Sequence, residues 1–111
     1  MITAKFTKNE SGIRLTIDGH AGYSKDGCDD IVCAAVSGIF YALCGYLSNL
    51  KKKNYSLNSA EAGYADVECG YDGEEAMKLA CIGIWQISLS YPKCVRVNNS
   101  AWDWRMKEHT A

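Results

Sequence analysis

The sequence predicts an α+β domain in the order ββαββαβ, with two helices packed on one face of a mainly antiparallel sheet. Short stretches near both ends and in the middle alternate apolar and polar side chains, as half-buried strands do. Two longer stretches repeat apolar residues at spacings of three and four, as amphipathic helices do. The 111 residues are 48% hydrophobic and 23% charged, which is enough apolar material for one domain with a two-layer core.

The first two strands are predicted at residues 2–6 and 13–17, where apolar side chains alternate with polar ones. The turn-forming residues 9–12 join them into a hairpin, which ends at Asp18-Gly19-His20.

The first helix is predicted to open at Asp30, because an N-cap carboxylate accepts the free amide hydrogens of the first turn. Apolar side chains then recur on one face of this helix, at Val32, Val36, Ile39, Phe40, Leu43, Leu47 and Leu50. Residues 54–60 are polar and resemble a turn, and residues near Tyr55 and Leu57 are expected to pair with the strand that follows at residues 63–70.

The second half repeats the pattern, with a strand at residues 63–70 and a helix that Pro92 ends. Asp72 and Glu75 have the spacing of a capping box at the start of this helix. A last strand is predicted at residues 94–97. We therefore expect one domain over residues 1–98 and a tail over 99–111, with Trp102 and Trp104 either docked on the domain or partly ordered.

The charge balance makes no electrostatic case for direct nucleic-acid binding, since the net charge is -1 and the pI is about 6.1. The N-terminus lacks the apolar segment of a signal peptide, and the apolar runs read as too short to cross a membrane. We expect a cytoplasmic protein that is not bound to a membrane.

Six cysteines occur, but no two have the two-residue separation of a zinc ribbon or a thioredoxin-like site. We expect neither a metal nor another cofactor. Four of these cysteines are expected to be small buried apolar side chains: Cys44, Cys69, Cys81 and Cys94.

His20 and Cys33 carry the chemistry that the sequence points to. A histidine at a strand end and a cysteine in the first turn of a helix are the minimum pair for thiol nucleophilic catalysis. Ser37 lies one turn beyond Cys33 on the same helix face and could orient a substrate group or the imidazole. Asp29 and Asp30 oppose this reading, since nearby negative charge disfavours a thiolate. A histidine at a strand end or a cysteine in a helix is, by itself, more often structural than catalytic. It is the combination of His20 and Cys33 that predicts a catalytic site.

The loop at residues 21–29 contains Gly22 and Gly27 and has few apolar anchors. We expect it to be mobile in the empty enzyme and to order over the site when substrate binds.

The segments Asp18-Gly19-His20-Ala21 and residues 30–37, Asp-Ile-Val-Cys-Ala-Ala-Val-Ser, resemble the two signature motifs of the bacterial ribosomal-processing cysteine protease family, Prp. The resemblance covers residues 1 to about 98. It implies a homodimeric cysteine endopeptidase that removes the N-terminal extension of large-subunit ribosomal protein number twenty-seven. His20 and Cys33 match the family's catalytic dyad.

Three further residues match the family's motif positions and are implied to support the dyad: Gly19, Asp30 and Ser37. The family's substrates carry aromatic residues ahead of the cut, so an aromatic-lined groove using Tyr23, Tyr41 or Tyr46 would suit them.

Two other readings remain open. The protein could be a non-catalytic, ribosome-associated binding module of the same fold with Cys33 buried. It could also be a thiol-redox or metal-binding protein that uses Cys28 and Cys33, although four intervening residues are wrong for the common redox motif.

Overall fold

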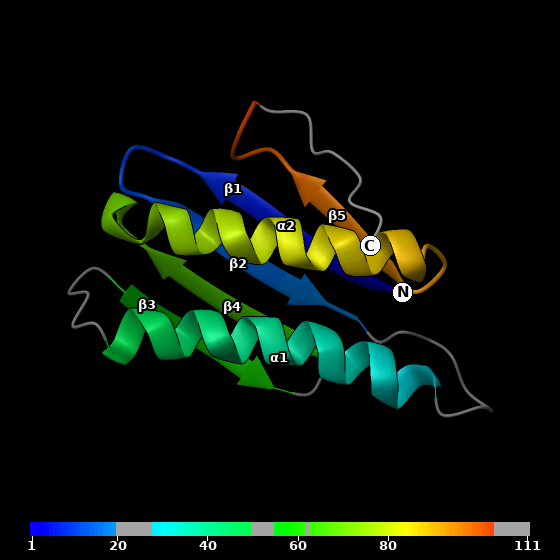
Figure 1. Ribbon diagram of the computed structural model, residues 1–111. Coiled ribbons are helices and arrows are strands. Elements are labelled where there is room, and N and C mark those ends of the chain that lie inside the picture. Colours follow the sequence, from blue (N-terminus) through cyan, green and yellow to red (C-terminus); the bar gives the residue numbers. More distant parts are fainter. Residues whose placement is uncertain (20–27, 50–54, 62, 104–111) are drawn as a thin grey trace.

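A five-stranded sheet with two helices across one face makes up the computed structural model (Figure 1). The structure describes residues 1–19, 28–49, 55–61 and 63–103. The elements are β1 (Ile2–Lys8), β2 (Ile13–Asp18), α1 (Cys28–Asn49), β3 (Tyr55–Glu61), β4 (Tyr64–Cys69), the short 3-10 turn η1 (Tyr71–Gly73), α2 (Glu74–Ser90) and β5 (Val95–Asn99). The predicted order ββαββαβ is confirmed.

The strands lie in the order β3-β4-β2-β1-β5. The pairs β1–β2, β2–β4 and β3–β4 are antiparallel, and only β1–β5 is parallel. Both helices lie side by side on the same face of this sheet, α2 over β1 and β2 and α1 over β3 and β4 (Figure 1). The predicted α+β arrangement is therefore confirmed.

The core lies between the sheet and the helices, and it follows from the alternation in the strands. Every second residue of the first two strands is buried toward the helices: Ile2, Ala4, Phe6, Ile13, Leu15 and Ile17. The helices contribute the apolar stripes that face these residues, including Val32, Val36, Phe40 and Leu47 from α1 and Met77, Cys81 and Ile84 from α2.

The prediction of a turn at residues 54–60 is wrong, because residues Tyr55–Glu61 form β3. This strand is at the edge of the sheet and exposes most of its side chains, so its polar residues do not oppose strand formation. Its register on β4 shifts between Leu57 and Ser59. A polar edge strand gives a weaker signal in sequence than a half-buried one.

Both helices begin at residues other than those predicted. α1 begins at Cys28, so Asp30 is its third residue and not its N-cap. Neither Cys28 nor Asp29 opposes a helix, and both belong to α1. α2 begins after η1, with Gly73 as an N-cap that has no side-chain hydrogen bond, so the capping box at Asp72 and Glu75 is also wrong.

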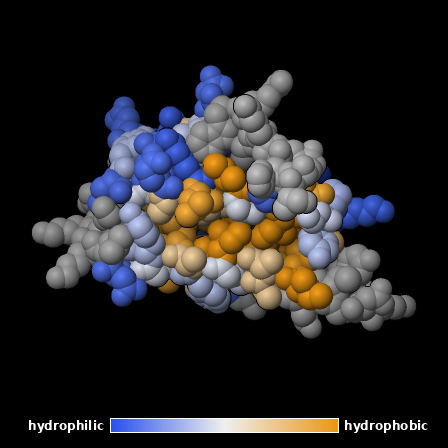
Figure 2. All heavy atoms as spheres, viewed as in Figure 1, coloured by the Kyte–Doolittle hydropathy of each residue, from blue (hydrophilic) through white to orange (hydrophobic). Residues whose placement is uncertain are grey.

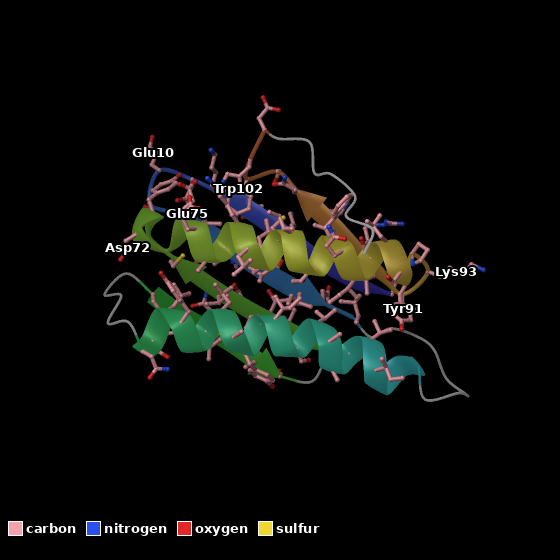
Figure 3. The ribbon with its side chains drawn as sticks, viewed as in Figure 1. Glu10, Asp72, Glu75, Tyr91, Lys93 and Trp102 are labelled. Atoms are coloured by element: carbon pink, nitrogen blue, oxygen red, sulfur yellow. The ribbon has the colours of Figure 1, made fainter. Side chains whose placement is uncertain are left out.

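The segment after β5 packs back onto the sheet. The Ser100 main-chain N–H donates to the Phe6 carbonyl at 3.0 Å, and the Trp102 ring lies 6.0 Å from the Phe6 ring between centroids. The Trp102 indole N–H donates to the Glu74 carboxylate at 2.9 Å (Figure 3 labels Trp102 above α2). Trp102 is therefore docked, while Trp104 lies outside the described residues.

A bidentate ion pair joins β2 to β4 on the sheet face away from the helices. The Arg14 Nε and Nη2 atoms donate to the two Asp66 carboxylate oxygens at 2.9 and 2.5 Å. The Asp66 side chain is 6% exposed and the Arg14 side chain 48%. The Arg14 guanidinium lowers the pKa of Asp66, chiefly through the hydrogen bonds.

α1 is longer and more apolar than the sequence analysis predicted. By length and composition alone, Ile31–Asn49 could span a membrane, with a mean hydropathy of 1.8. The expectation that every apolar run is too short is therefore wrong for this helix. Small residues such as Gly38 and Ser37 interrupt the apolar pattern but add no charge. A core helix of a soluble protein passes the same test, and α1 packs on the sheet and on α2.

Candidate active site

A cavity of about 390 Å³ opens between the first half of α1 and one end of the sheet. We call it the Cys33 cleft. Its lining residues come from three places in the chain: Ile2, Ile17 and Gly19; Cys33, Val36, Ser37, Phe40 and Tyr41; and Ala60, Glu61, Gly63, Tyr64 and Ala65. It thus brings together Gly19, Cys33 and Ser37 of the predicted site.

The floor of the cleft is a row of residues across three strands. Ile17 of β2 is in register with Ala65 of β4, which is in register with Ala60 of β3. The two alanines leave space under α1 that larger side chains would fill.

The wall of the cleft is one stripe of α1. Cys33, Ser37 and Tyr41 follow one another at intervals of four residues, so they lie on the same helix face. Cys33 is half-buried and packs against the edge of the core, while Ser37 is exposed. A thiol in this position is sheltered on the protein side and open to the cleft.

With Asp30 as the N-cap, Cys33 would have been the third helical residue, but it is the sixth residue of α1. At that position the main-chain N–H is bonded within the helix, so it cannot serve as an oxyanion donor. The helix dipole acts mainly within the first turn, so it favours a thiolate at Cys33 less than it would at the third helical residue. The backbone of Asp30 lies in that first turn.

Gly19 and Gly63 shape the opposite side of the cleft. Both have positive φ angles, 98° and 85°, which favour glycine. A Cβ atom on Gly19 would lie 2.2 Å from the Met1 carbonyl oxygen, so no other residue fits there without displacing the backbone. The chain leaves β2 through this constrained residue directly before His20. His20 itself and residues 21–27 of the predicted loop lie outside the described residues, while Cys28 and Asp29 belong to α1.

The three tyrosines proposed for an aromatic groove have different outcomes. Tyr41 lines the Cys33 cleft and is 64% exposed. Tyr46 lies instead in a groove between α1 and α2, and Tyr23 lies outside the described residues.

Sequence reasoning missed two aromatic residues in the cleft, Phe40 and Tyr64. Phe40 was assigned to the core stripe, and it is 3% exposed at the back of the cleft. The signal for Tyr64 was its place beside Gly63 at the start of a predicted strand, where a hairpin turn meets the end of β2.

Four cysteines lie in the core, away from the Cys33 cleft. Cys44, Cys69, Cys81 and Cys94 are buried with free thiols, as predicted. Burial raises the pKa of the Cys69 and Cys81 thiols to about 11 and also raises that of Cys44. Within residues 1–19, 28–49, 55–61 and 63–103, no group of three His, Cys, Asp or Glu side chains is placed to hold a metal ion.

The Cys33 cleft therefore offers a half-buried thiol, a hydroxyl one turn away and an apolar floor. This combination suits covalent attack by sulfur on a carbonyl group of a bound peptide. The apolar floor limits the access of water to one side of a group bound above it.

Comparison with known proteins supports this description. Residues 1–96 match the protein family described as cysteine protease Prp. No curated protein matches the sequence.

Several solved structures share the fold. The ribosomal processing protease Prp from S. aureus in complex with a substrate peptide has a TM-score of 0.74 at 21% identity, covering 88% of this chain and 98% of that one. The same protease with a covalently linked product peptide has a TM-score of 0.73 at 23% identity, with the same coverage. SMU.848 from Streptococcus mutans has a TM-score of 0.70 at 27% identity, covering 88% of this chain and 92% of that one.

The family match spans most of the chain and includes both β2, which leads to His20, and the part of α1 that carries Cys33. The protein belongs to the cysteine protease Prp family.

Proposed function

We propose that this protein is a cysteine endopeptidase that removes the N-terminal extension of large-subunit ribosomal protein number twenty-seven. The observation that carries the proposal is the position of Cys33, half-buried in a cleft that a peptide can enter, within a chain of the Prp family. The S. aureus protease of the same fold was solved with a substrate peptide and with a covalently linked product peptide. A ribosomal substrate implies that the protein works in the cytoplasm.

In the proposed reaction His20 accepts the proton of the Cys33 thiol, and the thiolate attacks the carbonyl carbon of the scissile peptide bond. The tetrahedral intermediate collapses as its C–N bond breaks, and the protonated imidazole donates its proton to the leaving amine. Water then hydrolyses the thioester, with His20 as the base, which releases the new carboxylate and restores the thiol. No redox step is needed.

The shape of the cleft supports an apolar or aromatic residue ahead of the cut. Ala60 and Ala65 leave depth in the floor, and Tyr41 flanks it on the α1 side. An aromatic substrate side chain could bury its ring against the alanines and contact Tyr41 edge to face. Ser37 lines the cleft one helical turn beyond Cys33, where its hydroxyl could hydrogen-bond a main-chain group of the substrate.

The decisive experiment is incubation of the protein with the extended ribosomal protein of the same organism, followed by mass spectrometry of the products. A single cut within the extension supports the proposal, provided that Cys33→Ala abolishes it. Binding without cleavage would favour a ribosome-associated module instead. If the wild-type protein does not cleave the substrate but has a thiol-redox activity that Cys28→Ser abolishes, the protein is a thiol-redox protein instead.

We also propose that two copies associate through the outer face of the helices. This face carries exposed apolar residues, among them Leu79 at 74%, Tyr46 at 43% and Ile82 at 42%. Figure 2 shows hydrophobic side chains gathered across the helices, and a groove of about 450 Å³ runs between α1 and α2. α1 has no charged residue between Ile31 and Asn49. A patch of this kind favours burial against a second copy.

A further inference from the structure

The outer edge of β3 pairs with no other strand in the described part of the chain. Residues Tyr55–Glu61 contain no proline, lysine or arginine. Proteins commonly place such residues on an edge strand to keep it from pairing with another chain. The register on β4 shifts between Leu57 and Ser59, which divides the edge into two short runs. Each run is able to accept a further strand.

The hydrogen-bond pattern shows which main-chain groups of β3 point outward. The Gly19 N–H donates to the Gly63 carbonyl, and these two residues are opposite each other when the β2–β4 register is continued by one residue. Opposite residues of an antiparallel pair are alternately bonded and not bonded, so Ala65 bonds to β2 and not to β3. Its partner Ala60 therefore directs its N–H and C=O groups to the free edge. The same alternation applies to Leu57, beyond the register shift.

The helix side of this edge is apolar and uncovered. Ala60 and Leu57 face the helices, because their partners Ala65 and Val67 lie in rows of β4 that face the core. Val67 is fully buried, whereas Leu57 is 44% exposed and Ala60 is also exposed. We call the exposed helix-side surface of Leu57 and Ala60 the β3 ledge. An added strand could cover it, since alternate side chains of a strand point to the same face.

The β3 ledge is continuous with the Cys33 cleft. Ala60 belongs to both, and Cys33 lines the cleft from α1. At the other end of β3, burial raises the pKa of Tyr55, and the Cys44 thiol nearby raises it further. α1 therefore runs along the ledge, with Cys33 near its Ala60 end and Cys44 near its Tyr55 end. A peptide strand bound on the ledge leads into the cleft.

We infer that the substrate segment ahead of the cut binds as an added strand on the free edge of β3. The inference rests on the proposed endopeptidase function. The residue next to the cut lies over the Ala60–Ala65 floor, and the preceding residues run back toward Tyr55, which makes the added strand parallel to β3. Main-chain hydrogen bonds supply affinity, and alternate side chains pack on the β3 ledge. The site therefore takes an extended peptide with apolar residues at every second position.

The test is a backbone scan of the substrate. Fluorescent peptides spanning the extension carry one N-methyl group at successive positions ahead of the cut, which removes a main-chain N–H and keeps the side chain. Binding is measured by anisotropy with the Cys33→Ala protein, and kcat/KM with active Cys33. N-methylation should weaken binding roughly threefold to tenfold at alternate positions and change it little between them. Losses that do not alternate would overturn the inference.

A matched pair of enzyme variants tests the β3 ledge itself. Leu57→Asp places a charge on the ledge and should weaken binding of the unmethylated peptide roughly fivefold or more, through lost apolar contact. Ser56→Asp introduces the same charge on the neighbouring exposed residue, which faces away from the helices. It should change binding less than about twofold, as expected of a surface substitution. Equal losses in the two variants would contradict packing on the ledge.

The binding scan separates this inference from the proposed function. Alternating losses for peptides that are never cut would contradict the protease and leave strand addition standing. Cleavage of peptides whose binding shows no alternation would keep the protease and exclude strand addition. If no peptide binds, both proposals fail.

Discussion

The main chains of Gly19 and Gly63 are joined by a 2.9 Å hydrogen bond, from the Gly19 N–H to the Gly63 carbonyl, in which both residues have positive φ. This bond holds the end of β2, one residue before His20, against the hairpin that carries Glu61 and Tyr64. Two sides of the Cys33 cleft therefore depend on two glycines that cannot be exchanged freely. The glycine before the histidine in the family motif is Gly19 here, and its positive φ explains why a glycine stands at this position.

Gly19→Ala should destabilise the fold and reduce cleavage. The added Cβ would lie 2.2 Å from the Met1 carbonyl oxygen at a φ of 98°, so the backbone must move. We expect a loss of about 1–3 kcal/mol in the free energy of unfolding, measured by denaturant titration. The control is Gly45→Ala, a helical position where the new Cβ meets only the Asn49 side chain at 4.0 Å. It should be neutral or stabilising, and equal behaviour of the two variants would contradict the argument.

Cys33 should be alkylated by iodoacetamide in the native protein much faster than the buried cysteines. Alkylation requires the thiolate, and at pH 8 a thiol with a pKa of about 11, as in Cys69 and Cys81, is about 0.1% ionised. Burial also blocks access to these two sulfurs. Peptide mapping after a short exposure should find the label at Cys33. Comparable labelling of Cys81 would show that this part of the core opens readily.

His20→Ala should lower kcat/KM by at least about 100-fold near neutral pH, as expected for loss of a general base. The deficit should shrink as pH rises toward 9, because an unassisted thiol then ionises. The measurement is a pH–rate profile of wild type and variant with the same peptide. A deficit that stays constant across the pH range would assign His20 a structural role.

Asp66→Asn should reduce stability by about 1.5–3 kcal/mol at neutral pH, the range for hydrogen bonds to a charged group. The pKa of Asp66 is lower in the folded protein than its ordinary value, so its contribution is present above about pH 4 and is lost as pH falls through the folded pKa. Denaturant titrations between pH 7 and pH 2 should show a shallower acid loss in the variant. Parallel curves for the two proteins would contradict this account.

Leu79→Glu should yield monomers if two copies pack through the helix face. Leu79 is 74% exposed, so the substitution disturbs no core contact and unfolding stability of the monomer should hold. Light scattering after size exclusion should give the mass of two chains for wild type and of one chain for the variant. Leu57→Glu, a 44% exposed leucine on β3, is the control and should remain dimeric. A monomeric wild type that binds lipid vesicles would indicate that a membrane covers this face.

The elements with one buried face could be predicted from sequence because their spacing records which side faces the core. β1, β2 and both helices have this property. For β3 only the pairing near Tyr55 and Leu57 was predicted and not the length of the strand, since an edge strand with little burial carries no alternation. Helix starts were also missed. Asp30 has the chemistry of an N-cap, but nothing in the preceding two residues stops the helix from extending to Cys28.

The motif residues could be identified from the sequence, whereas the other residues of the cleft could not. Cys33, Ser37 and Tyr41 share a helix face that spacing alone reveals. Glu61 and Tyr64 join them only through the register of β3, β4 and β2, which depends on pairing partners remote in sequence. The alanines of the floor have no chemistry that would single them out. They matter because their small side chains leave space for the cleft between the sheet and α1.

The parallel pairing of β1 with β5 has a consequence for synthesis of the chain. Ile2 is in register with Val95, so the first strand gains its second neighbour only after more than ninety further residues exist. The Phe6 ring is covered by Trp102, which is made later still. Until then β1 has a free edge, and the nascent chain depends on β2, β4 and the helices to hold its partial core. The sheet and its Phe6–Trp102 contact can therefore be completed only after residues 95–102 have been synthesised.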